Sequence, residues 1–487
     1  MHKQVKENRE LALWEALVPV ILLIIMLSYN VFVYGDDSLS GSNQFILLMG
    51  AAIAAIIGFL NKTSYKEMLD AVSKNLDTTT GAILILLMVG ALAGTWLLSG
   101  IIPAMIYYGL QVLSTSIFLP AAVVICSIIS VVTGSAWTTS ATVGIALIGI
   151  GGALGIPLGM VAGAVVSGAY FGDKLSPLSD TTNLAAAMAG TDLFTHIRYM
   201  ILTTVPTLVI TLIVFSIIGA NLDVHGSANI NGILTSIEQS FNIAPWLFIV
   251  PILVIGLIVK KTEPLIALLL GTILAAIFAV IFQPELLRNL SGSESLNFEA
   301  AYKVVMDAIT VSFSVPTENE TLTDLFDSGG MAGMLPTIWL IICAMVFGGV
   351  MEAIGALAKI SRSLLKISNS IFSLFANTVA SCLMLNITAS DQYLAIVIPG
   401  KMYSQAFKDK GLAPENLSRT LEDSGTVTSV LVPWNTCGAY NAGVLGVDTL
   451  TYLPFAVFNY VSPMMTLLFA ALNIKIKMLL QKDQAPA

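Results

Sequence analysis

Charged residues are scarce in this sequence, and one long stretch has none. Asp, Glu, Lys and Arg make up 11% of the 487 residues, against about 25% in soluble domains. Residues 78–172 contain none of them and no histidine. Several apolar runs reach the roughly 20 residues that a helix needs to cross a bilayer. The composition therefore excludes an ordinary soluble protein and predicts an all-α polytopic membrane protein.

Motifs of ATP hydrolysis and of zinc catalysis are also missing. The sequence has no Gly-rich loop ending in Gly-Lys-Ser/Thr and no His-Glu-x-x-His. There are three histidines, at His2, His196 and His225. The four cysteines show neither disulfide nor zinc spacing: Cys126, Cys343, Cys382 and Cys437. We therefore expect that the protein is not an enzyme and that it binds neither a cofactor nor nucleic acid. We expect any transport to be driven by ion gradients.

Basic residues in short loops predict how the chain crosses the membrane. Lys3, Lys6 and Arg9 precede the first apolar run, 11–34, which is too long for a signal-peptide core. Lys475, Lys477 and Lys482 follow the last run. By the positive-inside rule both termini are cytoplasmic, in a cell inner membrane. The same rule gives about ten crossings and two hairpins that re-enter the membrane.

The order of segments predicts two inverted repeats, 1–220 and 244–487, joined by an external linker, 221–243. In each repeat an amphipathic stretch (65–76; 298–313) precedes a long Gly-containing helix (81–99; 331–354). The first repeat has a hairpin at about 117–155 and a broken helix at about 157–190. The second has an external acidic loop at 284–330, a hairpin at about 369–408 and a broken helix at about 419–446.

Polar segments inside these apolar regions predict the site. A charge near the bilayer centre costs about 2.5 to 3.5 kcal/mol, so residues 172–183, Gly-Asp-Lys-Leu-Ser-Pro-Leu-Ser-Asp-Thr-Thr-Asn, are expected to be functional. Unwound backbone at such depth is tolerated where it is buried or lines a cavity. The alternatives are an ordinary loop that ends a helix, and hydroxyl groups that only pack or bond back to their own helix.

Oxygen ligands in these segments suit a small hard cation such as Na+. The predicted cation- or proton-binding residues are Asp173, Ser176, Ser179, Asp180, Thr181, Thr182, Asn183, Thr133, Ser135, Thr388, Ser390, Asp391, Asp423, Ser424, Thr426, Asn435 and Thr436, with Na+ itself at Asp173, Asp180 and Asp423. Lys174 is expected to neutralise Asp173, and Arg419 also to balance charge. The residues expected to shape the site are Trp137, Pro177, Gly425, Pro433 and Trp434. Because desolvation favours the neutral form of a buried carboxyl group, one carboxylate can hold either a proton or a metal ion. Such exclusive occupancy is the minimal mechanism of cation/proton antiport.

Two long motifs, residues 172–183 and residues 418–426 with 433–438, closely resemble the NhaC family of sodium/proton antiporters. Residues 391–394 with 399–400 look like the second hairpin apex of that family. The resemblance implies Na+/H+ exchange, a scaffold domain, a transport domain that carries the hairpins, elevator-type motion and a homodimer.

The same family pattern includes malate/lactate antiporters and amino-acid carriers, so the substrate stays open. Within the polar breaks only Lys174 is cationic, which favours a bare cation. The hairpin apices at 134–135 and 389–390 could instead present helix N-termini to a carboxylate. A small organic acid is therefore the second predicted substrate class, and a channel or a non-transporting scaffold is a third hypothesis.

Overall fold

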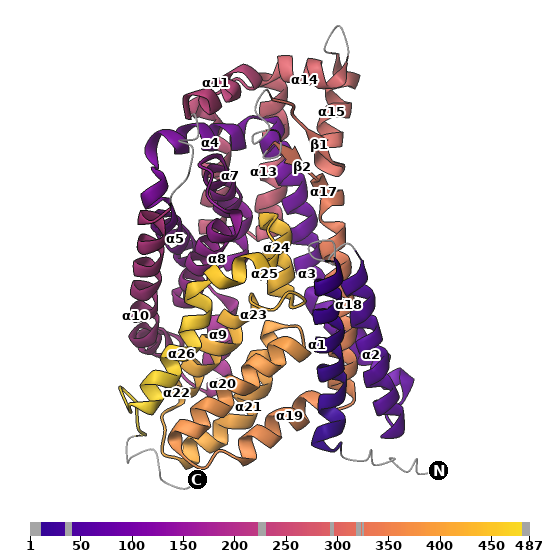
Figure 1. The fold of residues 1–487 in the computed structure, drawn as a ribbon, viewed down its shortest axis with the longest axis vertical. Helices are drawn as coiled ribbons and strands as arrows, with labels where there is room; N and C mark the ends of the chain where they lie inside the picture. The colour runs from indigo at the N-terminus through magenta and orange to yellow at the C-terminus, as the bar shows by residue number, and fades with distance from the viewer. Residues whose placement is uncertain are drawn as a thin grey trace.

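The computed structural model describes residues 11–479 apart from 35–40, 223–229, 293–296, 318–322 and 324–325. His2, Lys3, Lys6, Arg9, His225 and Lys482, used above, lie outside the described residues. The regular secondary structure of the described residues is helical apart from one antiparallel pair, β1 (Phe313–Ser314) with β2 (Asp327–Ser328), and an isolated bridge between Leu412 and Met478. Nine of its helices are long and apolar enough to cross a membrane, or up to eleven if each bent pair is one span. The predicted all-α polytopic membrane protein is confirmed (Figure 1).

The helices of the first half follow one another with short connections. They are α1 (Leu13–Tyr34), α2 (Ser42–Leu60), α3 (Tyr65–Leu98), α4 (Ile101–Val112), α5 (Thr115–Thr133), α6 (Ala136–Thr139), the π-helical η2 (Ser140–Gly144), α7 (Ile145–Ala153), α8 (Leu158–Leu175), α9 (Asp180–Ala189) and α10 (Leu193–Ala220).

The second half begins with α11 (Ile230–Ser240). Its elements are η3 (Pro245–Phe248), α12 (Ile249–Val259), α13 (Pro264–Phe282), α14 (Pro284–Ser291), α15 (Phe298–Thr310), α17 (Gly330–Gly333), α18 (Leu335–Ala353), α19 (Ala356–Lys366), α20 (Ile371–Thr388), α21 (Gln392–Asp409), α22 (Pro414–Leu421), the π-helical η4 (Glu422–Thr426), α23 (Val427–Ser429), α24 (Thr436–Leu445), α25 (Thr449–Tyr452), η5 (Leu453–Phe455) and α26 (Val457–Ala471).

One predicted boundary is wrong, because α3 is a single helix where two separate elements were expected. Ser64 and Glu67 form a capping box that starts the helix at Tyr65. Farther along, the hydroxyl groups of Thr78 and Thr79 bond back to carbonyls one turn earlier, at 2.6 and 3.0 Å. Such bonds are compatible with a continuous helix. In the second half the expected separation is present, since β1, β2 and α17 lie between α15 and α18.

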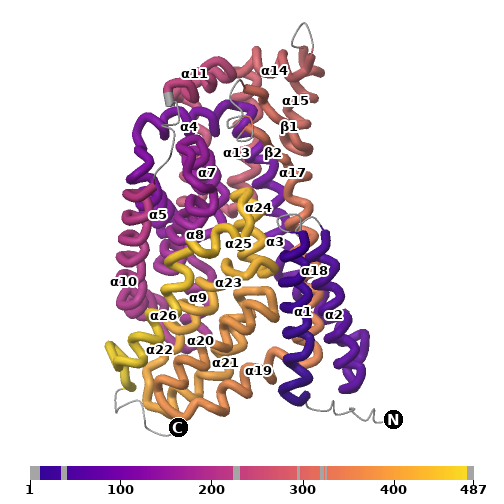
Figure 2. Tube along the Cα trace, viewed as in Figure 1, coloured from indigo at the N-terminus to yellow at the C-terminus, as the bar shows by residue number. Residues whose placement is uncertain are grey.

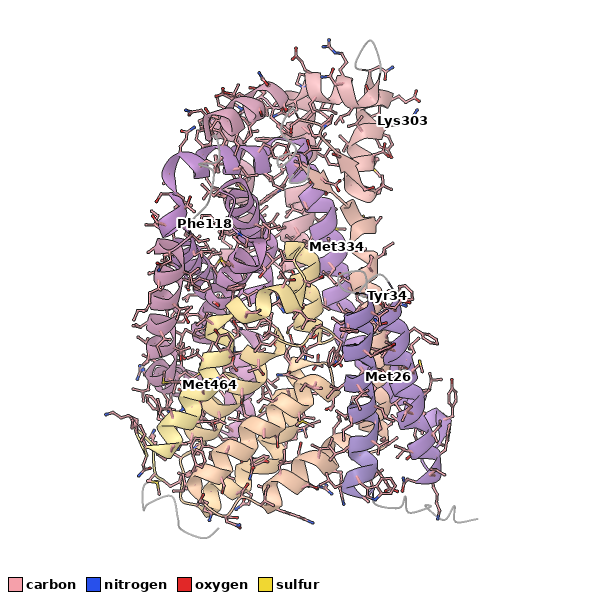
Figure 3. All side chains as sticks on the ribbon, in the orientation of Figure 1. Met26, Tyr34, Phe118, Lys303, Met334 and Met464 are labelled. Carbon is pink, nitrogen blue, oxygen red and sulfur yellow. The ribbon has the colours of Figure 1, made fainter. Side chains whose placement is uncertain are left out.

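The helices form two groups that lie side by side (Figures 1 and 2). One group contains α1, α2, α3, α13 and α18, in which α18 packs against both α2 and α3, and α13 packs against α3. The other contains the paired helices α5 with α8 and α20 with α21, flanked by α10 and α26, which pack on each other. Apolar side chains such as Tyr34 and Met464 stand exposed on the outside, as a lipid-facing surface requires (Figure 3). The repeat boundaries, their inversion and the membrane re-entry of the hairpins stay predictions.

Candidate functional site

A cavity of about 600 Å³ lies where the tips of the two hairpins approach the break between α8 and α9. Both halves of the chain and both groups of helices line it. Its charged lining residues are Asp173, Asp180, Asp391, Glu263 and Lys261. Four of these are acidic and one is basic, so the cavity is chemically suited to a cation.

The first hairpin reaches the cavity through the turn between α5 and α6. α5 ends at Thr133, and Gly134 turns the chain with a φ of +70°. The hydroxyl group of Ser135 then caps α6, accepting a hydrogen bond from the backbone N–H of Thr138 at 3.1 Å. A Cβ atom on Gly134 would lie 2.5 Å from Cβ of Leu178. The tip is therefore packed directly onto the break between α8 and α9.

That break is a short capped turn around Pro177, which has no N–H to continue the helix. The hydroxyl group of Ser179 caps α9 by accepting from the N–H of Thr182 at 3.4 Å. The amide group of Asn183 donates to the carbonyls of Pro177 and Ser179, at 3.1 and 2.6 Å. Two of the carbonyls that the break releases are thus bonded by Asn183, which has a structural role here.

The second hairpin tip is held by the loop between α23 and α24. The indole N–H of Trp434 donates to the carbonyl of Ile387 at 2.8 Å, and the backbone N–H of Thr436 donates to the carbonyl of Ser390 at 3.0 Å. Asp391 then caps α21 by accepting from the N–H of Leu394 at 2.9 Å. These bonds fix the position at which the Asp391 carboxylate meets the cavity.

Asp173 is a buried carboxylate in the lining of the cavity. Its side chain is 7% exposed, and its Oδ1 atom has no hydrogen-bond partner among the described residues. The carboxylates of Asp180 and Glu422 lie within electrostatic range of it. A buried carboxylate without a partner is costly unless a proton or a cation joins it.

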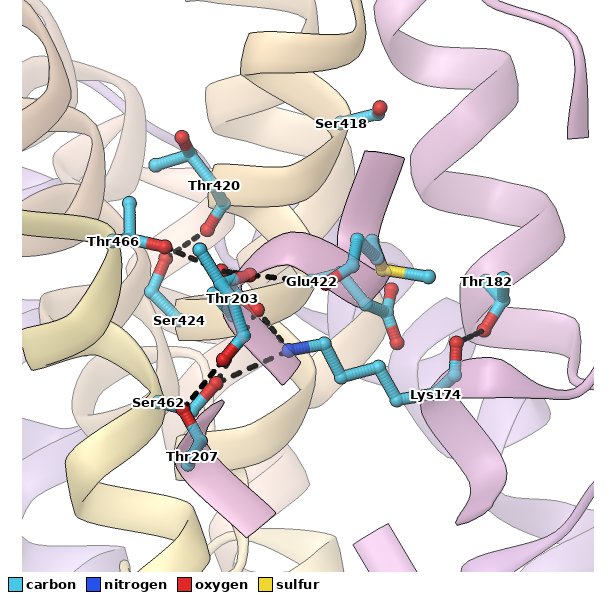
Figure 4. Close-up of polar contacts among 12 residues, drawn as sticks. Lys174, Thr182, Thr203, Thr207, Ser418, Thr420, Glu422, Ser424, Ser462 and Thr466 are labelled. Atoms are coloured by element: carbon cyan, nitrogen blue, oxygen red, sulfur yellow. Dashed lines mark hydrogen bonds and ion pairs between the residues drawn. The ribbon is translucent and has the colours of Figure 1, made fainter. Parts of the chain in front are cut away.

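Lys174, the next residue, points to a different cluster (Figure 4). It forms a buried ion pair with Oδ1 of Asp423 and bonds to the hydroxyl group of Ser462 at 3.2 Å. Oδ2 of Asp423 accepts from the hydroxyl group of Thr203 at 3.0 Å and from that of Thr466. The cluster joins α8, η4, α10 and α26.

The predicted pairing of Lys174 with Asp173 is therefore wrong, because neighbouring helical residues point about 100° apart. Asp423 is also absent from the lining of the cavity, and its two oxygen atoms already have donors. Asp173, Asp180 and Asp423 do not form one ligand set. The residues in the described ranges include no group of three or more His, Cys, Asp or Glu that could hold a metal ion.

Glu422 is a buried carboxyl group that the sequence reading did not single out. Its side chain is fully buried in the π-helical segment η4, a feature that often marks functional sites. Its Oε1 accepts from the hydroxyl group of Thr181 at 3.2 Å, and its Oε2 has no partner among the described residues. Its position beside Asp423 in a polar segment was the available signal.

Arg419 is fully buried and lies over the ring of Tyr199, with its Cζ 4.6 Å from the ring centroid. None of its side-chain nitrogen atoms has a hydrogen-bond partner among the described residues. Its predicted charge-balancing role is therefore not visible as a bond to a carboxylate. Trp137 stacks on Tyr440 at 4.3 Å and lines the cavity.

The predicted residues fall into two sets by position. Those that line the cavity are Thr133, Ser135, Trp137, Asp173, Asp180, Asp391 and Thr436. The others lie in the surrounding segments without lining it: Lys174, Ser176, Pro177, Ser179, Thr181, Thr182, Asn183, Thr388, Ser390, Arg419, Asp423, Ser424, Gly425, Thr426, Pro433, Trp434 and Asn435. Lining residues outside the predicted site set include Thr78, Thr79, Lys261 and Glu263, and also Gln392 and Tyr393 of the predicted second hairpin apex.

The Na+/H+ antiporter family matches residues 168–474, a range that contains the end of α8, all of α9, the second hairpin and the second broken helix. This chain belongs to that family. It is 37% identical to the Na+/H+ antiporter NhaC of Alkalihalophilus pseudofirmus, over 88% of this chain and 90% of the relative. It is also 37% identical to the malate-2H+/Na+-lactate antiporter of Bacillus subtilis, over 94% of each chain. The arginine/ornithine antiporter ArcD of Halobacterium salinarum is 31% identical, over 95% of this chain and 93% of the relative. The NhaC-type resemblance is confirmed, and the family is one of transporters and not of enzymes.

Proposed function

We propose that this protein is a secondary active transporter that exchanges Na+ for H+ across the cytoplasmic membrane. The observation that carries the proposal is the charge of the cavity, whose lining has four carboxylates and one ammonium group. Carboxylate, hydroxyl and carbonyl oxygens are the ligands that small hard cations prefer. The name of the NhaC relative supports the same exchange.

Asp173, Asp180 and Asp391 are the groups that hold the exchanged ions. The unpartnered oxygen of Asp173 takes either Na+ or a proton, since one bound cation removes the electrostatic reason for the other. Thr133 and Ser135 at the first hairpin tip supply hydroxyl oxygens to the same cavity. Protonation on one side of the membrane then releases Na+, and Na+ binding on the other side releases the proton.

The proposal also includes an elevator-type motion of the transport domain. It further includes a homodimer whose termini are cytoplasmic. Both groups of helices line the cavity, since Thr78 and Thr79 of α3 line it together with residues of the two hairpin tips. A movement of the group containing α5, α8, α20 and α21 along the group containing α3, α13 and α18 would carry the site without dismantling it. This placement, with the family resemblance, supports the elevator proposal.

Exchange of small organic acids is the second candidate. The name of the Bacillus subtilis relative favours it, as does Lys261 in the lining. A carboxylate would also be attracted to helix N-termini. At the second hairpin, however, the N-terminus of α21 is capped by the negatively charged Asp391, which repels an anion. The geometry therefore favours the cation.

Purified protein in liposomes separates the two candidates. An imposed pH gradient is expected to be dissipated by added Na+ alone, and Asp173→Asn is expected to abolish the effect. Asp307→Asn, at an exposed position of α15, is the matched control and should exchange normally. Labelled malate, lactate or arginine that moves with Na+, without any pH change when these solutes are omitted, would select organic-solute exchange instead.

A further inference from the structure

The hydroxyl group of Tyr393 donates a 2.5 Å hydrogen bond to Oδ2 of Asp180. Tyr393 belongs to α21 of the second hairpin, and Asp180 begins α9 in the first half. Both residues line the cavity. The bond therefore connects the two halves of the chain at the cation site itself.

This bond completes the fixation of the Asp180 carboxylate. Oδ1 of Asp180 accepts from the backbone N–H of Thr181 at 2.8 Å, so each oxygen has one donor. Asp180 is nevertheless exposed and lines the cavity. Each carboxylate oxygen has two lone pairs, so one per oxygen stays available to a cation.

Tyr393 is itself held at a fixed place. It is the second residue of α21, two residues after the cap at Asp391. The tip that precedes it is bonded to the α23–α24 loop through Ser390 and Thr436 at 3.0 Å. Because the second hairpin holds Tyr393 in place, the hydrogen bond from Tyr393 also fixes the carboxylate of Asp180.

We propose that Tyr393 is a positioning residue that sets the cation affinity of the site by holding Asp180 in its binding orientation. The inference rests on the proposed function and adds to it a residue outside the aspartate and threonine sets. The O–H group of Tyr393 is the only hydrogen-bond donor of its side chain, and it already donates to Asp180. The side chain therefore has no donor left for an anionic solute. Without the hydroxyl group, Asp180 regains side-chain rotation, which cation binding must then suppress.

Tyr393→Phe keeps the ring and removes only the donor. In this variant, cation binding must immobilise the Asp180 side chain, which costs free energy. The Na+ concentration for half-maximal exchange should therefore rise about three- to tenfold. The maximal rate should stay within about twofold of wild type. Tyr403→Phe is the matched control, because Tyr403 lies on the same helix and its hydroxyl group bonds Ser381 and Asn377 at 2.9 and 3.0 Å, outside the cavity lining. This control should leave half-saturation unchanged.

A second readout does not depend on transport. Na+ should raise the melting temperature of purified wild-type protein, and the Na+ concentration that gives half of this shift should increase in Tyr393→Phe only. Unchanged half-saturation in both assays would overturn the inference, and so would a loss of folded protein in Tyr393→Phe but not in Tyr403→Phe. If wild type itself shows no Na+-dependent exchange and no Na+-dependent stabilisation, the proposed function fails instead.

Discussion

Lys174 and Asp423 form an ion pair between α8 and η4, with both side chains fully buried. The pair joins the polar segment of the first half to that of the second, and hydroxyl groups of α10 and α26 complete it. A buried pair is not in itself a large source of stability, but removing one partner leaves a buried charge without compensation. The two broken helices are therefore expected to hold together as one unit behind the cavity.

Lys174→Met should destabilise the protein by about 3–5 kcal/mol, because it leaves Asp423 charged and buried. The measurement is the melting temperature in detergent or lipid nanodiscs. Lys303→Met removes an exposed i,i+4 partner of Glu299 and should leave the melting temperature unchanged. The double variant Lys174→Met/Asp423→Leu should recover much of the loss. Equal stability of Lys174→Met and wild type would show that the pair is not a structural link.

The parts of the fold that depend on local patterns could be predicted from the sequence. Apolar runs gave the helices, and Pro177 with its flanking serines gave the break between α8 and α9. Continuity of α3 could not be predicted, since a run of three threonines looks like an interruption. In the structure the helix runs unbroken from Tyr65 to Leu98, and the hydroxyl groups of Thr78 and Thr79 bond back to carbonyls of the same helix.

The sequence predicted which types of residue form the site better than it predicted which of them contact one another. Asp173, Asp180 and Asp391 share one cavity, as polar residues at predicted breaks can be expected to do. The partners of Lys174 and of Asp180 lie 249 and 213 residues away along the chain, and no local pattern specifies contacts at that separation. Such pairings depend on how the two halves pack, which a single sequence does not show.

Gly134→Ala should weaken cation binding, and the strain of a left-handed backbone alone does not account for this effect. The added Cβ would meet Leu178 at 2.5 Å and Oγ of Ser176 at 3.1 Å, which pushes the first hairpin tip away from the break. Gly190→Ala is the matched control, because its φ of +79° carries a similar strain but nothing lies within 4 Å. Both variants should lose about 1 kcal/mol of stability from the left-handed backbone. Only Gly134→Ala should raise the Na+ half-saturation concentration, and equal transport kinetics in the two variants would contradict this.

Asp391→Asn separates the capping role of this residue from its charge. Asparagine caps a helix about as well as aspartate, so the bond to the N–H of Leu394 is kept and the melting temperature should stay within about 1 °C of wild type. One negative charge of the cavity is lost, and the Na+ half-saturation concentration should rise about tenfold. Asp391→Ala should show the same transport defect together with a stability loss of about 1 kcal/mol. Normal exchange in Asp391→Asn would restrict Asp391 to the capping role.

Asn386→Ala tests how the second hairpin is attached to the π-helical segment. The buried amide group of Asn386 donates to the carbonyl of Gly425 at 2.8 Å and to the hydroxyl group of Thr428 at 3.0 Å, and its Oδ1 accepts from Asn435 at 3.3 Å. Removing it deletes these three buried bonds, at about 0.5–1.5 kcal/mol for each bond. Thr428 keeps its bond to the carbonyl of Ser424, and Asn435 keeps its bond to the backbone carbonyl of residue 386. We expect a loss of about 2–4 kcal/mol in the free energy of unfolding.

The control for this variant is Asn221→Ala, where an exposed amide bonds one carbonyl at 2.8 Å at the end of α10. Its melting temperature should differ little from wild type, because water can replace that bond. Since the attachment through Asn386 also fixes the tip that carries Asp391, Asn386→Ala should raise the Na+ half-saturation concentration at temperatures where the variant is still folded. A variant that loses stability but keeps wild-type half-saturation would show that the tip is positioned by Trp434 and Thr436 alone.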